Sequence, residues 1–188
     1  MAKASTLKNM LVCLTLVCLI CSAVLAVVYA LTKDPIDAAQ VAKTNASIAK
    51  VLPEFTSSPV ETRCDFNGVE YTYYRAEGAG YAIISVVSGF GGPLSVMVGI
   101  DENGNVHNTA VLSHTETPGL GAKCQSDEGF LSQFRGWNPS EKKLVVRKDG
   151  GDVDAITAST ITSRAYTLAI ANAVALFNSL NEGGETNE

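Results

Sequence analysis

The segment DAITASTITSRAYT, Asp154 to Thr167, concentrates hydroxyl side chains directly before a long apolar helical pattern. Five of them precede Arg164: Thr157, Ser159, Thr160, Thr162 and Ser163. A strand, a tight turn of small residues and a helix start would leave backbone N–H groups unpaired at the positive end of the helix dipole. Such a start suits a phosphate group. The alternative is that Thr160 or Thr162 only caps the helix, which takes one hydroxyl.

A second segment, HTETPGLGAKC from His114 to Cys124, combines a proline and two glycines with flanking polar residues. Pro118, Gly119 and Gly121 predict an irregular backbone that other groups can approach closely. No serine lies in a GxSxG elbow, and no GxxxxGK[ST] phosphate loop occurs. No CxxC motif or His/Cys cluster predicts a metal site. We therefore expect no catalytic residues of its own and no metal ligands.

The elements that must position these segments begin with an apolar run. Met10–Leu31 is 22 residues long and has no charge. At about 1.5 Å per residue, a helix of this length spans a hydrocarbon layer of roughly 30 Å. A cleaved signal peptide ending at Ala30 is the alternative, but the run exceeds the usual apolar region of about 7–15 residues. We expect an uncleaved membrane anchor.

Charge indicates where the rest of the chain lies and what it does not bind. Residues 32–188 carry 12 basic and 19 acidic side chains, a net charge of −7. That sign argues against nucleic acid as a partner. Lysines lie on both sides of the anchor, so their count barely decides the orientation. The very short N-terminal tail favours an extracytoplasmic C-terminal domain.

The chain after the anchor predicts an α+β domain with a mostly antiparallel sheet and a C-terminal helix. Ile36–Leu52 should be a helix that stops at Pro53, and Asn67-Gly68 is a strong hairpin signal. Further strands are predicted at Tyr81–Val87, Leu94–Ile100 and Val106–Leu112, with short candidates at Leu144–Arg147 and Val153–Ile156. Turns are predicted at Gly89–Pro93 and Asp101–Asn105, a short helix within Gln125–Phe134 and a long one at Thr162–Leu180.

The expected organisation has four parts. They are a tail and transmembrane anchor at 1–32, a connecting helix and loop at 33–58, a ligand-binding domain at 59–182 and a polar tail at 183–188.

The two polar segments together resemble the FMN-binding domain family. DAITASTITSRA is similar to its flavinylation motif, which is roughly Asp, two variable residues, Ser or Thr, Gly, Ala, Thr. Ala158 and Ser159 depart from the usual Gly and Ala but remain small. ETPGLG, Glu116 to Gly121, resembles the G subunit of Rnf-type ion-translocating electron transport complexes, as does GYAIISVVSGFGGPLSVMVGID. The C subunit of the sodium-pumping NADH:quinone reductase is the alternative within this resemblance.

The resemblance implies covalent FMN in an electron-transfer subunit of a membrane complex. Thr160 would carry the flavin through a phosphoester, and Thr157, Ala158 and Ser159 would hold its phosphate or the turn. Glu116, Thr117, Gly119, Leu120 and Gly121 would lie against the ring or the phosphate. A separate FAD-dependent FMN transferase would attach the cofactor. The other partners would be complex subunits and lipid of the bacterial inner membrane, with the domain on the periplasmic side. A membrane-anchored assembly module without flavin is the rival from another class.

Overall fold

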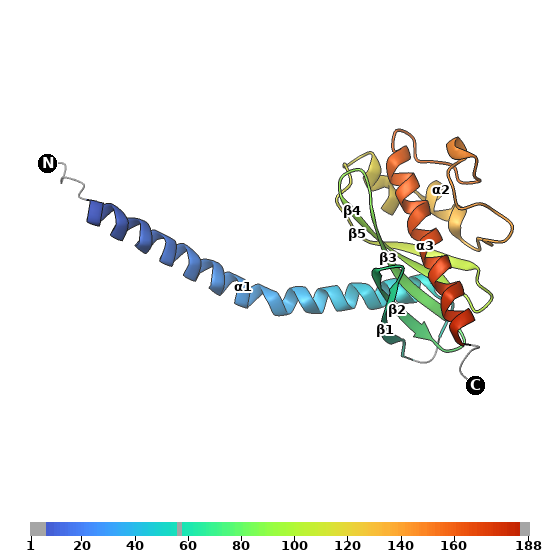
Figure 1. Ribbon diagram of the computed structural model, residues 1–188, viewed down its shortest axis with the longest axis horizontal. Coiled ribbons are helices and arrows are strands. Elements are labelled where there is room, and N and C mark those ends of the chain that lie inside the picture. The colour runs from blue at the N-terminus through green and yellow to red at the C-terminus, as the bar shows by residue number, and fades with distance from the viewer. Residues whose placement is uncertain (1–6, 56–57, 185–188) are drawn as a thin grey trace. The chain divides into compact units, whose positions relative to one another are not determined.

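A computed structural model describes residues 7–55 and 58–184, with side chains to residue 181. The chain divides into two compact units at Lys43 and Thr44. The described part of the first unit is the stretch of helix α1 from Leu7 to Lys43, and the helix ends at Val51, in the second unit. Figure 1 shows the elements in order, and the strands found among the described residues lie in the second unit.

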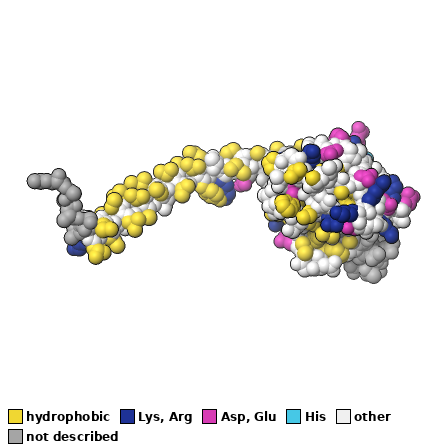
Figure 2. Space-filling view, turned by 90° about the horizontal axis from the view of Figure 1, so that it is seen from above, with side chains coloured by type: hydrophobic (Ala, Val, Ile, Leu, Met, Phe, Trp, Pro, Cys, Tyr) yellow, Lys and Arg dark blue, Asp and Glu magenta, His cyan; other side chains and the backbone are white. Residues whose placement is uncertain are grey.

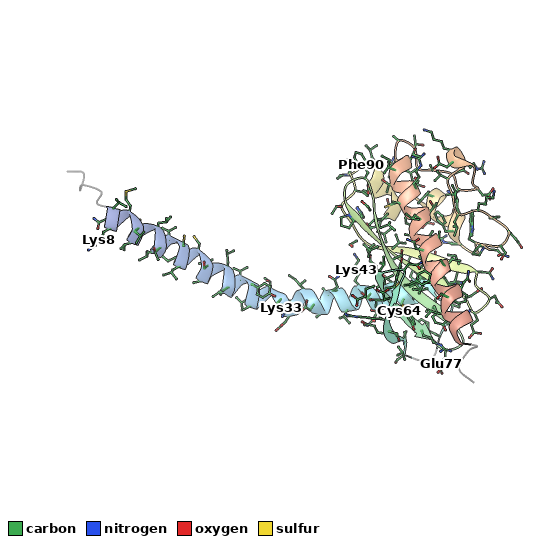
Figure 3. All side chains as sticks on the ribbon, in the orientation of Figure 1. Lys8, Lys33, Lys43, Cys64, Glu77 and Phe90 are labelled. Atoms are coloured by element: carbon green, nitrogen blue, oxygen red, sulfur yellow. The ribbon has the colours of Figure 1, made fainter. Side chains whose placement is uncertain are left out.

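The apolar part of α1 is exposed along its whole length. Leucine, valine, isoleucine and methionine side chains cover the part of the helix before Lys33 (Figure 2). Lys8 and Lys33, labelled in Figure 3, bound a stretch that is long and apolar enough to cross a membrane. An aqueous protein would bury such a surface, so its exposure is consistent with a lipid surrounding.

The predicted anchor and the predicted helix after it form one continuous helix, which corrects the expectation of two. Pro35 lies inside α1. Its missing N–H removes one bond to the carbonyl of Leu31, one turn earlier, without ending the helix. Just before it, the Thr32 hydroxyl donates to the carbonyl of Val28 at 2.8 Å. The predicted stop at Pro53 is confirmed, since α1 ends at Val51.

Five antiparallel strands form a sheet in which each strand pairs with the next one in sequence. They are β1 Val60–Phe66, β2 Val69–Ala76, β3 Gly80–Ser88, β4 Pro93–Ile100 and β5 Val106–His114. The predicted hairpin is confirmed: Asn67 and Gly68 have φ of 55° and 77°, as the tight turn between β1 and β2 requires. The α+β fold class is likewise confirmed.

The helix α3, Thr160–Gly184, covers one face of this sheet (Figure 1). It begins two residues before the predicted start and includes residues 183–184 of the expected tail; residues 185–188 lie outside the described residues. Tyr166, Ala169, Ile170 and Ala173 are fully or almost fully buried against strand residues such as Ile83 and Val98. Small alanines at helical spacing let the helix backbone approach the sheet closely.

The end of α1 packs on the opposite face of the sheet. Ile48 and Val51 are buried with Ala82, Met97 and Ala110 in a second, smaller cluster. A Cβ on Gly99 of β4 would collide with the carbonyl oxygen of Val51, so a glycine is needed for this approach.

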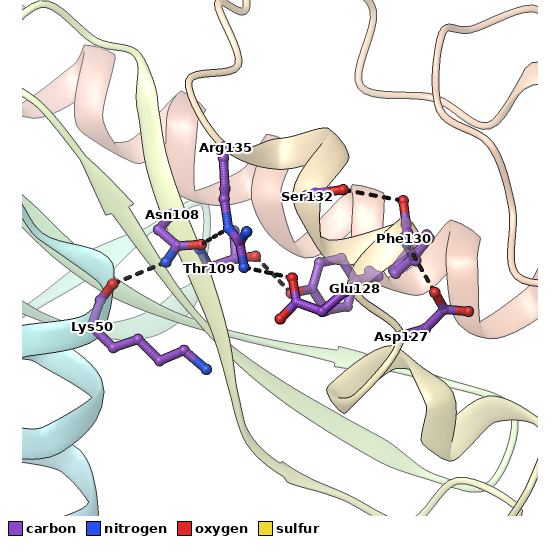
Figure 4. Close-up of polar contacts among 10 residues, drawn as sticks. Lys50, Asn108, Thr109, Asp127, Glu128, Phe130, Ser132 and Arg135 are labelled. Atoms are coloured by element: carbon purple, nitrogen blue, oxygen red, sulfur yellow. Dashed lines mark hydrogen bonds and ion pairs between the residues drawn. The ribbon is translucent and has the colours of Figure 1, made fainter.

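Polar contacts also hold that helix end. Figure 4 shows the Asn108 amide of β5 donating to the carbonyl of Lys50 at 3.0 Å. The Asn108 carbonyl oxygen accepts from Arg135 at 3.4 Å, and Arg135 pairs with Glu128 at 2.8 Å. The side chain therefore links α1 to the segment that follows β5.

The segment between β5 and α3 differs from its prediction in two places. The single short helix expected within Gln125–Phe134 is divided into 3-10 turns at Gly121–Gln125 and Ser132–Phe134 and a helical turn α2 at Glu128–Leu131. The two short strands expected at Leu144–Arg147 and Val153–Ile156 reduce to one parallel bridge, Val146 with Val153. A 3-10 turn at Arg147–Asp149 and the following glycines interrupt the extended backbone.

Candidate functional site

The first turn of α3 presents unpaired backbone donors. Ser159 donates its N–H to the carbonyl of Ile156 at 3.0 Å, and Ser163 donates to the carbonyl of Ser159, also at 3.0 Å. The N–H groups of residues 160–162 lie between these bonds, and they have no acceptor in the part of the chain that the structure describes. They provide a partial positive charge at the end of a 25-residue helix.

A buried hydroxyl holds the turn that leads into this helix. The Ser163 Oγ accepts from the N–H of Ile156 at 3.0 Å and donates to the carbonyl of Ser159 at 3.0 Å. Ala158, at the top of the turn, has φ of 60°, which is the left-handed region that L residues seldom adopt. This conformation gives a physical reason for a glycine at the same place in the motif that the sequence resembles.

A pocket of about 350 Å³ opens at this helix start. That volume is within the range of roughly 300–1,000 Å³ usual for ligand sites. Three segments line it: the β3–β4 turn, the loop after β5 and the turn into α3. The lining residues are Phe90, Glu116, Thr117, Leu120, Gly121, Ala158, Ser159, Thr160, Ile161 and Thr162.

The pocket combines apolar side chains with a polar end. Phe90 is 66% exposed although it is a large aromatic residue, and Leu120 and Ile161 are also exposed. Phe90 lies at the end of the sheet where α3 begins (Figure 3). The polar end holds Thr160 and Ser159. Ser159 is only 7% exposed, and its Oγ has no hydrogen-bond partner among the described residues.

A buried carboxylate joins the three segments. Glu116 is 5% exposed. Its Oε1 accepts from the N–H of Phe90 at 2.8 Å, and its Oε2 accepts from the Thr162 hydroxyl at 2.7 Å. Burial and the nearby Glu116 raise the pKa of the Cys124 thiol to about 11, so this thiol stays neutral and unreactive at neutral pH.

The structure brings most of the predicted site residues together. Seven of the nine line the pocket: Glu116, Thr117, Leu120, Gly121, Ala158, Ser159 and Thr160. The other two, Thr157 and Gly119, are exposed, and neither lines the pocket. Sequence reasoning missed Phe90, Ile161 and Thr162 as pocket residues. An aromatic residue between the glycines of SGFGG was a usable signal for Phe90, because a turn alone does not require it.

The first residue of the hydroxyl-rich motif contacts a different region. Asp154 pairs with Arg147, with 3.1 Å between Oδ1 and Nε. The Gln133 side chain forms two hydrogen bonds with the Asp154 backbone. Its Oε1 accepts from the Asp154 N–H at 2.7 Å, and its Nε2 donates to the Asp154 carbonyl at 3.1 Å. Asp154 therefore fixes the approach of the chain to the turn and is not among the pocket-lining residues.

The charged side chain in the first turn of α3, Arg164, pairs with another side chain of the protein. Arg164 forms two hydrogen bonds to the Asp149 carboxylate at 2.6 and 2.7 Å. These bonds lower the pKa of Asp149. No group of three or more His, Cys, Asp or Glu side chains that could hold a metal occurs in the described ranges 7–55 and 58–181. The pocket suits a ligand that has an apolar ring system and an anionic end.

FMN has that composition, and the residues present fit it. Its phosphate matches the unpaired N–H groups of residues 160–162 and the unpartnered Ser159 hydroxyl. Its ring system matches the exposed apolar side chains of Phe90, Leu120 and Ile161.

Comparison with known proteins agrees with this fit. Residues 89–175 match the family described as FMN-binding domain, and residues 1–51 match the RnfG N-terminal region. The G subunit of the ion-translocating oxidoreductase complex of Shewanella piezotolerans is 32% identical, with 94% of this chain and 91% of that protein covered. The corresponding G subunit of Shewanella baltica is 33% identical, with 88% and 86% covered.

A solved structure also resembles the fold. It is that of the C subunit of the Na(+)-translocating NADH-quinone reductase from Parabacteroides distasonis. The similarity covers 70% of this chain and 78% of that one, with 20% identity and a TM-score of 0.48.

The matches to the family models and to the G subunits extend over both the apolar helix and the domain with the pocket. The protein is thus a single-pass, membrane-anchored protein with an FMN-binding domain. The chain belongs to the family of the G subunits of ion-translocating oxidoreductase complexes.

Proposed function

We propose that this chain is a flavin-carrying electron-transfer subunit of a membrane complex that couples electron transfer of the ferredoxin/NAD type to ion translocation. The observation that carries the proposal is the pocket at the start of α3, which lies within the FMN-binding match. When bound, FMN supplies the redox chemistry. The relatives at 32–33% identity are G subunits, which favours this assignment over the C subunit of the quinone reductase.

The protein's own residues would bind and orient the cofactor. The N–H groups of residues 160–162 and the Ser159 hydroxyl would hold the phosphate, because they are the unpaired donors of the pocket. Phe90 and Leu120 would contact the ring and exclude water from part of it. No side chain pair in the pocket forms an acid/base set with a substrate, so we expect no independent turnover of a small molecule.

We further infer that FMN is attached covalently at Thr160. This residue lines the pocket at the first position of α3, beside the unpaired donors. The Thr160 hydroxyl would attack the flavin-side phosphorus of FAD. The new Oγ–P bond forms as the pyrophosphate P–O bond breaks, AMP leaves, and the hydroxyl proton passes to a base of the transferase. An alcohol is poorly reactive by itself, so a separate FAD-dependent FMN transferase is required.

The tether would keep the cofactor in a compartment where free FMN is scarce. We propose that the domain lies on the periplasmic side of the bacterial inner membrane, with the exposed apolar side chains of α1 in lipid. Electrons would arrive and leave through other subunits of the complex, because the described residues hold one candidate flavin pocket and no metal cluster.

Attachment is tested by co-expressing the full chain with the transferase. We expect a fluorescent band on a denaturing gel and a mass gain of one FMN minus water. Thr160→Ala should lose both signals. Thr157→Ala is the matched control, because Thr157 is exposed and outside the pocket lining. Flavin that stays on Thr160→Ala and disappears from Thr157→Ala would refute the assignment, and absence of flavin from the wild type would favour an assembly module.

The side of the membrane is tested separately. A protease added to spheroplasts should digest the domain that follows α1. Complete protection of that domain, with digestion after the membrane is permeabilised, would reverse the proposed orientation. N-terminal sequencing of the purified protein should show that the anchor Met10–Leu31 is still present.

A further inference from the structure

Glu116 lies at the junction of the three segments that line the pocket. It follows β5, and its carboxylate reaches two other segments. Oε1 accepts from the N–H of Phe90 at 2.8 Å and from the N–H of Gly91 at 3.4 Å, both in the β3–β4 turn. Oε2 accepts from Thr162 in the first turn of α3 at 2.7 Å. The three donors fit the ionised carboxylate, which only accepts hydrogen bonds.

Two glycines make the space for this carboxylate. A Cβ on Gly89 would collide with Oε1, and a Cβ on Gly121 would collide with Oε2 and lie 2.7 Å from the Thr162 Oγ1. Neither glycine has a positive φ, so the backbone conformation does not require them. Their role is steric: both segments leave room for the same side chain. The arrangement is therefore built around the Glu116 carboxylate.

The backbone of Glu116 is held as well. Its N–H donates to Nδ1 of His114 at 3.2 Å, and the Nε2 of the same ring lies 3.0 Å from Oε1 of Gln125. Nδ1 therefore accepts and Nε2 carries the proton that Gln125 accepts. With its backbone and its carboxylate both fixed, Glu116 has little freedom to turn toward solvent.

We propose that Glu116 is the positioning residue of the flavin pocket. Its carboxylate holds the Phe90 turn and the first turn of α3 at a fixed separation, so that the aromatic side chain and Thr160 face the same cavity. Its buried negative charge also opposes the gain of electrons by a flavin in that cavity. This inference rests on the proposed function for the flavin, while the link between the segments is a property of the chain alone.

The hydroxyl of Thr162 is the part of this link that can be removed with least change of shape. Thr162→Val keeps the branched side chain and removes the donor, which leaves a buried oxygen of Glu116 unpaired. An unpaired buried charge is costly, so the carboxylate should leave its place and release the N–H groups of Phe90 and Gly91. Thr162→Ser keeps the donor and should keep the link.

The first experiment uses the full chain, purified in detergent from cells without the transferase, so that no flavin is attached. Hydrogen–deuterium exchange is followed at the amides of Phe90 and Gly91. We expect exchange at least tenfold faster in Thr162→Val and within about twofold of wild type in Thr162→Ser. Equal exchange in wild type and Thr162→Val would overturn the positioning role.

A second pair of variants protects the test against a general loss of stability. Gly121→Ala places a methyl group on the Glu116–Thr162 bond and should accelerate the same two amides. Gly129→Ala is the control, because its Cβ would meet only Asp127 Oδ1 at 3.2 Å. Faster exchange in Gly121→Ala confined to the pocket segments supports the link. Acceleration of the same size in Gly129→Ala would overturn it.

The charge is tested in the flavin-loaded protein by spectroelectrochemical titration. Glu116→Gln keeps the size of the side chain and an oxygen that can accept from Phe90, but it removes the negative charge. We expect reduction to become at least tenfold more favourable, a rise of about 30 mV for two electrons. Gly129→Ala, outside the pocket lining, is expected to leave the potential unchanged. An unchanged or lower potential in Glu116→Gln would refute the effect of charge. Failure of the wild-type protein to load flavin would refute the proposed function and leave the exchange result standing.

Discussion

Replacing Ala158 with glycine should stabilise the protein, because of the backbone at this position. Ala158 has φ of 60°. The left-handed region costs an L residue about 1–2 kcal/mol, and glycine avoids this cost. Glycine also loses more conformational freedom on folding, which costs roughly 0.5–1 kcal/mol relative to alanine. Subtracting these ranges gives a net gain for Ala158→Gly of about 0–1.5 kcal/mol, with a central value of about 0.75 kcal/mol.

Thermal unfolding of the full chain in detergent measures this gain. Trp137 is the single tryptophan and is buried in the core, so its fluorescence reports unfolding of the domain. For a chain of this size, 1 kcal/mol corresponds to a change in Tm of about 2–4 °C. For the central value we therefore expect an increase in Tm of about 1.5–3 °C.

Ala155→Gly is the matched control, since Ala155 precedes the same turn without a positive φ. There the substitution only adds freedom to the unfolded chain and should cost about 0.4–1 kcal/mol. A similar loss of stability in both variants would show that Ala158 is not in the left-handed region in solution.

Three further predictions concern groups around the core. Because hydrogen bonds from Arg164 lower the pKa of Asp149, their stabilisation is present above about pH 4, the usual range of an aspartate, and is lost as the pH falls through the lowered pKa. Asp149→Asn should therefore lower Tm at pH 5–8 and not at strongly acid pH, as measured by the same fluorescence; a constant difference at all pH values would contradict this. Cys124, with its pKa raised to about 11, should resist maleimide at pH 7.5 in the folded protein and react after denaturation, as mass spectrometry of the modified peptide would show. Tyr166→Phe removes a buried hydrogen bond of 2.8 Å to the Thr109 hydroxyl and should cost about 1 kcal/mol in urea unfolding, whereas an unchanged midpoint would mean that the bond contributes nothing.

The sheet and the last helix were predictable because local patterns determine them. Asn67-Gly68 can adopt the positive φ angles of a two-residue turn, and the flanking runs can only pair across it. The apolar positions of the last helix, Tyr166, Ile170, Val174 and Phe177, recur at helical spacing and are all buried. Because each strand pairs with the next one in the sequence, the strand order requires no pairing between distant segments.

Prediction from the sequence failed where the secondary structure of a segment depends on contacts that its own residues do not reveal. Val145 and Val146 favour a strand, but only a single bridge to Val153 is available, and no ladder forms. The anchor and the helix at Ile36–Leu52 were predicted as separate elements, yet the loss of one hydrogen bond at Pro35 did not end α1.

In the candidate site, too, local motifs could be predicted from the sequence and long-range contacts could not. The motif at residues 154–160 is contiguous, so its resemblance could be recognised. The bond between Glu116 and Thr162 joins residues 46 positions apart, and no local pattern encodes it. Phe90 was hidden for a related reason, because its turn lines the pocket only after the sheet has formed.

The division of the pocket among three segments has a consequence for the order of maturation. The proposed acceptor residue, Thr160, belongs to one short segment and is only partly buried. Its surroundings instead come from the β3–β4 turn and the loop after β5 as well as the start of α3. Attachment at Thr160, as proposed, would therefore need a single stretch of chain, whereas shelter of the cofactor would need the finished tertiary structure. We expect a chain that is arrested before α3 docks to be modifiable yet to leave its flavin open to water, so that collisional quenching of flavin fluorescence would follow the last step of assembly.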